Sequence, residues 1–184
     1  GQARWLDRDL AAGGPFRFVA LHYPLYSSDE RHLGGWENLR TAFAPVLSRQ
    51  GVLAVFQGHV HFYERDEAGG IQFVTDARGG GPPYRPGAGT IPEFCNGLVD
   101  TLGYTRVTVR SPDLPAVMEV IRVADIRDGA VTLRRPCTIF ERFLLEHRGP
   151  AGGEHGVQPD FLLQIRRIVG LPPLAEGIRI LSGH

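Results

Sequence analysis

Two short apolar runs with a helical segment between them set the strongest limit on how this chain can fold. The runs FRFVALH (16–22) and VLAVFQ (52–57) have the length and the residue types of buried strands. Between them, apolar side chains recur at helical spacing over residues 36–50, and Gly51 follows as a helix C-cap. A strand, a helix and a strand in this order predict a right-handed parallel crossover, and therefore an α/β fold.

The flanking segments extend this pattern at both ends. Residues 2–12 show the apolar spacing of an amphipathic helix. Further strands are predicted over 70–77, 104–110, 116–124 and 130–135. Several of these runs alternate apolar and polar residues, which indicates an antiparallel sheet with one buried face. The segment 78–97 is rich in glycine and proline and is predicted to be a long surface loop.

The 184 residues predict one main domain followed by a tail. We assign residues 1–148 to the domain, because all the predicted helices and strands fall within it. Residues 149–184 begin with the linker-like GPAGGEHGVQPD and continue with the apolar FLLQIRRIVGLPPL. We expect this tail to pack back onto the domain.

Charge and hydropathy argue against two classes of partner. The 20 basic and 20 acidic side chains cancel, and neither sign forms a long block, so no nucleic-acid or acidic-lipid surface is predicted. No apolar stretch is long enough to span a bilayer, so no membrane partner is predicted either. Cys95 and Cys137 lack metal-ligand spacing and are expected to be free, buried thiols.

Three histidines lie where the predicted parallel strands end. His22 closes the first strand, His59 follows the second, and His61 comes two residues later. The carboxyl ends of such strands line the crevice in which open α/β sheets bind ligands. If 59–61 stays extended, both imidazoles leave the same side with Cα atoms about 6.6 Å apart. That spacing suits one metal ion or an adjacent pair, and hydrogen-bonded histidines without a metal are the alternative.

The residues around these histidines resemble a known family. GHVHFYER (58–65) and ALHYPLYSS (20–28) are similar to the last two motifs of the calcineurin-like metallophosphoesterases, and especially of the purple acid phosphatases. Weaker similarity extends over 2–84 and includes the strand and glycine-rich loop at 70–84. The G-H-x-H-x-Y-E-R stretch is the most specific part.

This resemblance implies a fold and a set of site residues. It implies a two-sheet β-sandwich with mixed sheets, flanked by helices, and two metal ions such as iron, zinc or manganese. His22 and His59 would bind one metal ion, and His61 would bind the other. His32, ten residues after His22, would face the substrate phosphate and protonate the leaving group. Tyr26 of the same motif is a further candidate for contacting the substrate.

The chain also departs from the family. The earlier motifs D-x-H, G-D and G-N-H-[DE], which supply carboxylate and asparagine ligands, do not occur in this sequence. We therefore expect the C-terminal portion of a binuclear phosphoesterase, with an N-terminal half missing, that is inactive without that half or a complementing chain. In the intact enzyme a metal-bound hydroxide would attack a phosphate ester. Glu64 and Arg65 of the Y-E-R sequence are expected to form an ion pair that holds their loop.

Two other functions remain compatible with the sequence. His22, His59 and His61 could surround a single zinc ion with an open fourth position, which predicts a mononuclear hydrolase that is complete in this chain. Alternatively, the chain could be a binding module without a metal that uses the loop 78–97 and the apolar tail as contact surfaces. The first alternative predicts one metal ion per chain, and the second predicts no dependence on the histidines.

Overall fold

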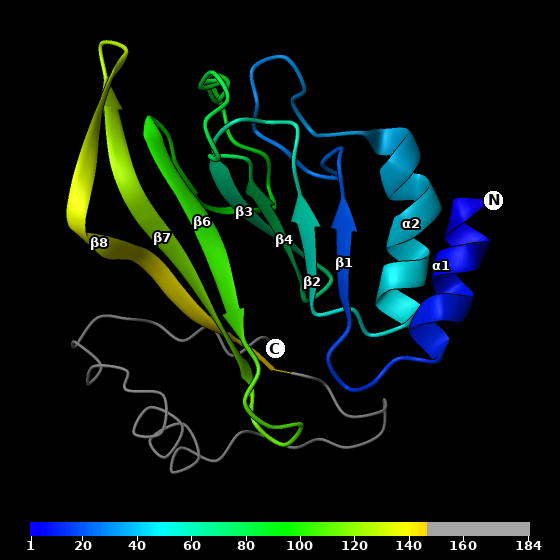
Figure 1. The fold of residues 1–184 in the computed structure, drawn as a ribbon. Coiled ribbons are helices and arrows are strands. Elements are labelled where there is room, and N and C mark those ends of the chain that lie inside the picture. Colours follow the sequence, from blue (N-terminus) through cyan, green and yellow to red (C-terminus); the bar gives the residue numbers. More distant parts are fainter. Residues whose placement is uncertain (147–184) are drawn as a thin grey trace. The chain divides into compact units, whose positions relative to one another are not determined.

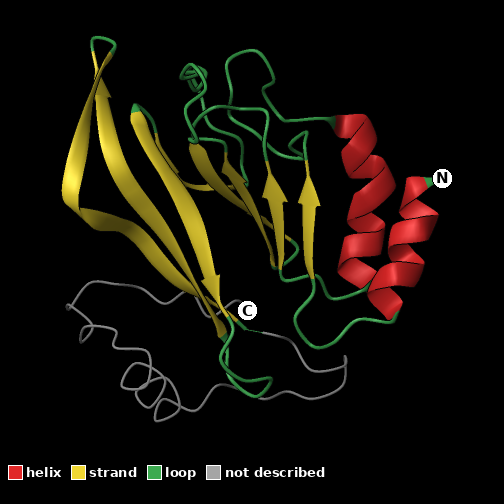
Figure 2. Cartoon of the chain, in the orientation of Figure 1, coloured by secondary structure: helices red, strands yellow, loops and turns green. Residues whose placement is uncertain are grey.

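The computed structural model describes residues 1–146 of the chain. The chain divides into two units, Gly1–Arg148 and Gly149–His184. The predicted linker and tail lie outside the described residues, so the packing of that tail stays a prediction. Within residues 1–146 the strands form two sheets, and helices α1 (Gln2–Ala11) and α2 (Glu37–Arg49) lie beside the first of them (Figures 1 and 2).

The first sheet is mixed and has the strand order β1-β2-β4-β3-β5. Its strands are β1 (Phe18–Leu21), β2 (Ala54–Gln57), β3 (Tyr63–Ala68), β4 (Ile71–Asp76) and β5 (Phe94–Leu98). Strand β2 pairs in parallel with β1 and with β4, whereas β3 is antiparallel to β4 and β5. The predicted parallel crossover from β1 through α2 to β2 is therefore confirmed.

The second sheet is antiparallel and has the order β6-β7-β8. Its strands are β6 (Thr101–Thr108), β7 (Ala116–Arg127) and β8 (Ala130–Leu145). Buried residues of both sheets form one cluster, the inter-sheet core, which includes Ala54, Tyr63 and Val74 of the first sheet and Met118 and Val120 of the second. This shared core makes the described unit a sandwich, as the resemblance implies.

A second cluster, the helix-side core, joins the helices to the other face of the first sheet. Leu6 and Leu10 of α1 and Leu47 of α2 pack in one cluster with Val55 and Phe73. The period of the apolar residues in both helices is what places these side chains on one side. The first sheet is thus covered on both faces, which fits the continuous apolar runs of its parallel strands.

Two strands of the first sheet were not predicted, and a third was assigned to the wrong sheet. Strand β3 has the sequence YERDEA, in which four charged residues hide the alternation that marks a half-buried strand. Strand β5 lies, except for its last residue, inside the segment 78–97 that was predicted to be entirely loop. Strand β4 was expected in the antiparallel half, yet it pairs in parallel with β2. Strand β8 also continues well beyond the predicted end of its run.

Alternate residues of β3 serve the two faces of the sheet. The Tyr63 hydroxyl donates to Glu141 Oε2 at 2.6 Å, and the Arg65 guanidinium donates to Glu141 Oε1, which ties β3 to β8 of the second sheet. Glu64 is fully buried and instead accepts hydrogen bonds from Ser27 and Ser28. The expected ion pair between Glu64 and Arg65 is therefore wrong, because neighbouring residues of a strand point to opposite faces.

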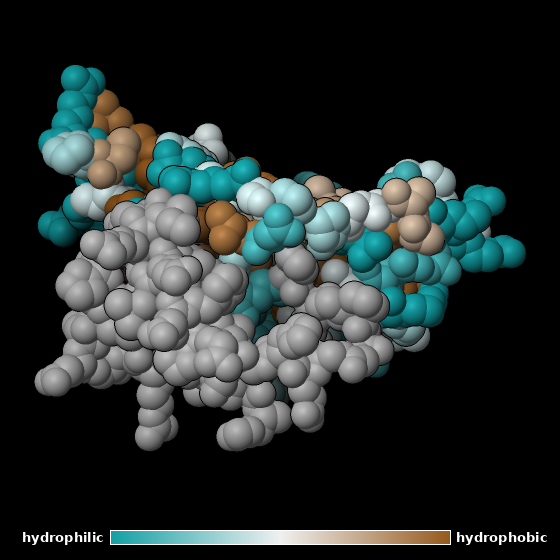
Figure 3. Space-filling view, turned by 90° about the horizontal axis from the view of Figure 1, so that it is seen from below, coloured by the Kyte–Doolittle hydropathy of each residue, from teal (hydrophilic) through white to brown (hydrophobic). Residues whose placement is uncertain are grey.

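The surface of the described unit carries polar and apolar regions. Figure 3 shows hydrophilic residues at the end formed by the helices and apolar residues on the side of the β7–β8 hairpin. Val131 and Leu133 of β8 are exposed.

Cys95 and Cys137 are free, as expected, but both are exposed, so their predicted burial is wrong. Among residues 1–146, no helix is long and apolar enough to cross a membrane.

Candidate functional site

The predicted histidines lie at the carboxyl ends of β1 and β2. His22 directly follows β1, and His59 follows β2 after Gly58. His59 Nδ1 lies 3.2 Å from His22 Nε2. The backbone of His59 has a φ of 65°, a left-handed conformation that costs a non-glycine residue about 1–2 kcal/mol. A turn at His59 thus brings its ring against His22, in a position that is open to solvent.

The facing nitrogens of His22 and His59 suit a shared metal ion. Two nitrogens bound to a tetrahedral zinc ion at about 2.05 Å lie about 3.3 Å apart, close to the separation seen here. Burial, and then the nearby His22, His32 and His61, lower the pKa of His59. The neutral imidazole is the form that binds a metal. The donor set therefore fits part of a site for zinc or iron, to which imidazole is a common ligand.

His61 points to a different place from His59. Its Nδ1 lies 2.8 Å from the Pro82 carbonyl oxygen, and its ring packs on Tyr84 with centroids 4.5 Å apart. A carbonyl oxygen can only accept, so Nδ1 carries the proton and Nε2 keeps its lone pair. The expectation of an extended segment is wrong, because the left-handed turn at His59 sends the two rings apart.

Gly81 gives His61 the space it occupies. A Cβ atom at this position would lie 2.6 Å from His61 Cε1 and 2.7 Å from His61 Nδ1. Such distances are far below normal contact, so any other residue at position 81 requires the ring or the loop to shift. The glycine-rich loop that follows β4 is therefore part of the site.

His32 lies close to His59 and is held by two neighbours. Its Nδ1 is 2.7 Å from Asp29 Oδ2, and its ring stacks on Trp36 with centroids 4.4 Å apart and planes at 20°. The centroids of His32 and His59 are 5.4 Å apart. The structure therefore brings His22, His32 and His59 into one group.

The loop that carries His32 is held in place by side chains of β2 and β3. The side-chain oxygen of Gln57 accepts a hydrogen bond from the Leu25 N–H at 2.6 Å. Glu64 accepts one from the Ser28 N–H at 2.7 Å and one from the Ser27 hydroxyl at 3.2 Å. Burial raises the pKa of Glu64, and these hydrogen bonds oppose that rise. Two polar side chains of the sheet thus define the path of the loop.

A second loop is joined to the first. Residues Asp29 and Pro86 form an isolated antiparallel bridge. On either side of it, the Glu30 N–H donates to the Arg85 carbonyl at 3.1 Å and the Gly87 N–H donates to the Ser28 carbonyl at 2.7 Å. The segment after β4 therefore supports both His61 and the loop that carries His32.

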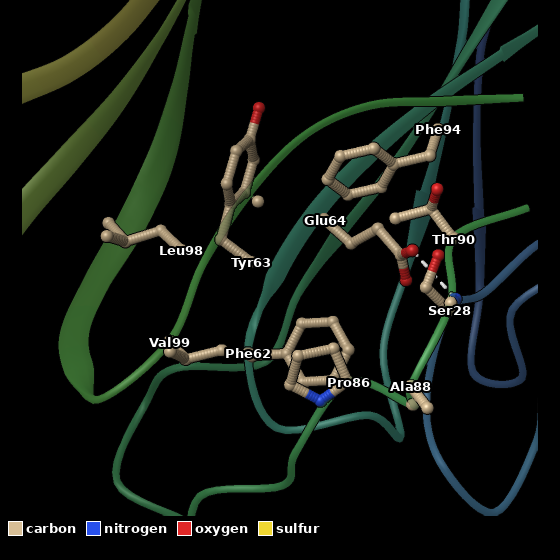
Figure 4. A pocket seen from close by; sticks show the side chains of 13 residues that line it. Ser28, Phe62, Tyr63, Glu64, Pro86, Ala88, Thr90, Phe94, Leu98 and Val99 are labelled. Carbon is tan, nitrogen blue, oxygen red and sulfur yellow. Dashed lines mark hydrogen bonds between the residues drawn. The ribbon is translucent and has the colours of Figure 1, made fainter.

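A cavity of about 530 Å³ lies between this second loop and the edge of the first sheet (Figure 4). Phe62, Pro86 and Phe94 give it apolar walls, and the Glu64 carboxylate is turned toward Ser28. The remaining lining residues are Tyr63, Gly87, Ala88, Gly89, Thr90, Gly97, Leu98 and Val99. The cavity lies next to the residues that shape the histidine group.

Tyr26 lies apart from the histidines. Its ring packs on Phe73 with centroids 4.6 Å apart, within the helix-side core, and the Arg40 guanidinium lies over it. Burial raises its pKa, so the hydroxyl keeps its proton. The substrate contact of Tyr26 stays a prediction.

The single-zinc arrangement is not assembled in the described residues. Residues 1–146 contain no group of three or more histidine, cysteine, aspartate or glutamate side chains placed to hold one metal ion. His22 and His59 converge, whereas His61 is drawn to Pro82. A complete metal centre needs ligands beyond this set.

Several residues that shape the site were not predicted from the sequence. Asp29 precedes His32 by three residues, and this D-x-x-H spacing was the signal that could have indicated a carboxylate partner. Gly81 belongs to a glycine run in which nothing marks one position above its neighbours. Trp36 was assigned only to the helix, although its ring contacts both His32 and His59.

Similarity to curated proteins covers a part of the chain. Purple acid phosphatase 22 of Arabidopsis thaliana is 43% identical over 68 residues, which are 35% of this chain and 16% of that protein. Fe(3+)-Zn(2+) purple acid phosphatase 12 of the same organism is 37% identical over 70 residues, or 36% of this chain and 15% of that protein. The match thus spans about one sixth of the length of these relatives. No protein-family model matches the chain.

Two solved structures share the fold. Purple acid phosphatase PPD1 from yellow lupin (Lupinus luteus) seeds matches with a TM-score of 0.56 and 19% identity, over 72% of this chain and 27% of that chain. GAP50, the anchor in the inner membrane complex of Plasmodium, matches with a TM-score of 0.63 and 16% identity. This match covers 93% of this chain and 48% of that chain. At these identities the likeness shows the fold alone. Together with the curated relatives, this shared fold supports the resemblance of the chain to metallophosphoesterases of the purple acid phosphatase type.

Proposed function

We propose that the protein containing this chain is a metal-dependent phosphoesterase that hydrolyses phosphate esters. In this proposal His22 and His59 bind one metal ion and His61 binds a second. The carrying observation is the 3.2 Å separation of His22 Nε2 and His59 Nδ1 at the carboxyl end of the sheet. The similarity to purple acid phosphatases, one of them named for iron and zinc, supports the metal pair.

The chain's own residues have distinct roles in this proposal. His61 presents Nε2 as a ligand, because its Nδ1–H donates a hydrogen bond to the carbonyl oxygen of Pro82. When both ring nitrogens of His32 carry protons, the ring would donate the Nε2 proton to the oxygen of the leaving alcohol and keep the Nδ1 proton. Metal ions bound here would neutralise the charge of the phosphoryl oxygens and activate water. Three neutral imidazoles cannot balance two cations, so carboxylate ligands must come from outside residues 1–146 or from a partner chain.

Metal content and hydrolysis measured on the same sample test the proposal. We expect the full-length protein to hold two metal ions per chain by elemental analysis and to hydrolyse p-nitrophenyl phosphate. His59→Ala and His61→Ala should each lower the metal content and the turnover. The isolated 184-residue chain should bind little metal and show no turnover, because the earlier family motifs that supply carboxylate and asparagine ligands do not occur in its sequence.

His32→Ala is the matched control, since it removes a nearby imidazole that is not a proposed ligand. It should keep both metal ions and lower kcat for an alkyl phosphate, whose poor leaving group needs a proton, by about 100-fold, the typical effect of losing a general acid. Unchanged metal content in His59→Ala and His61→Ala would refute the ligand assignment. One tightly held zinc ion per chain, with activity in the isolated chain, would instead support the mononuclear hydrolase.

A further inference from the structure

We propose that Asp29 is a positioning residue for His32: it fixes the proton on His32 Nδ1 and thereby leaves Nε2 as the nitrogen that serves the substrate. This inference rests on the proposed function and adds a residue that acts through the general acid. It is carried by the 2.7 Å contact between His32 Nδ1 and Asp29 Oδ2.

Asp29 is itself held in place. Its side chain is 1% exposed, whereas that of His32 is 30% exposed. The Arg31 N–H donates to Asp29 Oδ2 at 3.2 Å, and the Asp29 N–H donates to the Ser27 hydroxyl at 3.0 Å. Ser27 in turn donates to the buried Glu64. The backbone of Asp29 is therefore anchored to β3 through Ser27 and Glu64, its carboxylate is held by the Arg31 N–H, and the imidazole that it contacts reaches solvent.

The arrangement determines which nitrogen of His32 carries out proton transfer. A carboxylate accepts hydrogen bonds and does not donate them, so the contact with Asp29 requires a proton on Nδ1. The two ring nitrogens are distinct, and the bond made by one sets the state of the other. Trp36 also restrains the imidazole of His32, because the two rings are stacked with their planes at 20° and this contact opposes rotation of the imidazole. Nε2 then lies on the side of the ring away from Asp29.

The state of His32 can be read directly by ¹⁵N nuclear magnetic resonance. In the full-length wild-type protein, free of metal and again loaded with zinc, we expect the neutral ring of His32 to carry its proton on Nδ1. Asp29→Asn preserves the shape of the side chain but can donate through its amide, so the Nε2–H tautomer should become populated. A wild-type His32 that carries its proton on Nε2 would overturn the inference without any activity measurement.

Kinetics with two leaving groups provide a second readout. Asp29→Asn should lower kcat for an alkyl phosphate about 100-fold, because a poor leaving group needs the proton. The loss for p-nitrophenyl phosphate should be only a few-fold, and KM should change little for both substrates. Equal losses for the two substrates, or no loss, would contradict a role through the general acid.

A paired substitution guards against misfolding of Asp29→Asn. Trp36→Phe keeps an aromatic plane on His32, whereas Trp36→Ala removes it, so only the alanine variant should show the leaving-group dependence. If both variants match the wild-type protein, the inference fails. If the wild-type protein hydrolyses no phosphate ester and binds no metal, the proposed function fails, and the tautomer measurement still reports on Asp29.

Discussion

Replacing Asp66 with asparagine should stabilise the fold at alkaline pH and flatten the dependence of its stability on pH. Asp66 is fully buried on β3, and both of its carboxylate oxygens lack a hydrogen-bond partner within residues 1–146. Burial, and then the charges of Glu64 and Glu93, raise the pKa of Asp66 to about 8 against the opposing effect of Arg65. The native state therefore favours the neutral carboxyl group.

The direction of the pH effect follows from where each state releases its proton. The unfolded chain releases the Asp66 proton near 3.8, whereas the folded chain keeps it up to about 8. Between these values folding takes up a proton, so the stabilising contribution is complete at acidic pH and is lost as the pH rises through 8. The slope amounts to about 1.4 kcal/mol for each pH unit within that window.

Denaturant unfolding of wild type and variant across this window measures the effect. We expect Asp66→Asn to be more stable than the wild-type chain by on the order of 3 kcal/mol at about pH 9, and no more stable at about pH 5. Asp113→Asn, which changes an exposed aspartate, is the control and should leave the profile unchanged. Parallel profiles for Asp66→Asn and the wild-type chain would show that Asp66 is ionised in the fold.

Replacing Gly81 with alanine should weaken metal binding without removing any ligand. The added Cβ would lie 2.6 Å from His61 Cε1, so the imidazole has to move and its contact with Pro82 is disturbed. Loss of the group that orients a histidine ligand typically costs 10- to 100-fold in metal affinity. We expect a decrease of about that size in the full-length protein, with little change in the free energy of unfolding.

Gly79→Ala is the matched control, since a Cβ at position 79 meets no atom within 4 Å. Titration of the metal-free protein with zinc gives the affinities, and the His61 resonances report whether its ring has moved. A shifted His61 ring with wild-type zinc affinity would show that His61 does not bind the metal. An unmoved ring would mean that the loop of residues 79–81 yields instead.

Much of the fold was predictable because its driving pattern is local. The apolar runs of β1 and β2 and the helical period of α2 fix the parallel crossover. Strand β3 was not predictable in this way, because one of its buried carboxylates, that of Glu64, is accommodated by groups that lie far away in the sequence. Glu64 is held by Ser27 and Ser28, whose positions only the folded chain brings near. The charged residues of β3 are therefore typical of a loop when only the sequence is considered.

The site was predictable to the extent that topology determined it. Parallel strands with a histidine after each one place His22 and His59 at the same edge, and the structure has them there. The direction of His61 was not predictable, because it depends on one backbone angle at His59. The partners of His32 come from a loop whose path is set by side chains of β2 and β3, which no periodicity reveals.

The left-handed backbone of His59 has a consequence for any attempt to redesign this chain. Glycine adopts such a conformation without strain, so His59→Gly would relieve about 1–2 kcal/mol. A redesign that optimised stability alone would therefore remove this imidazole early. Stability and the histidine group are in conflict at this one residue, and a more robust version of the fold would be one that had lost its chemistry.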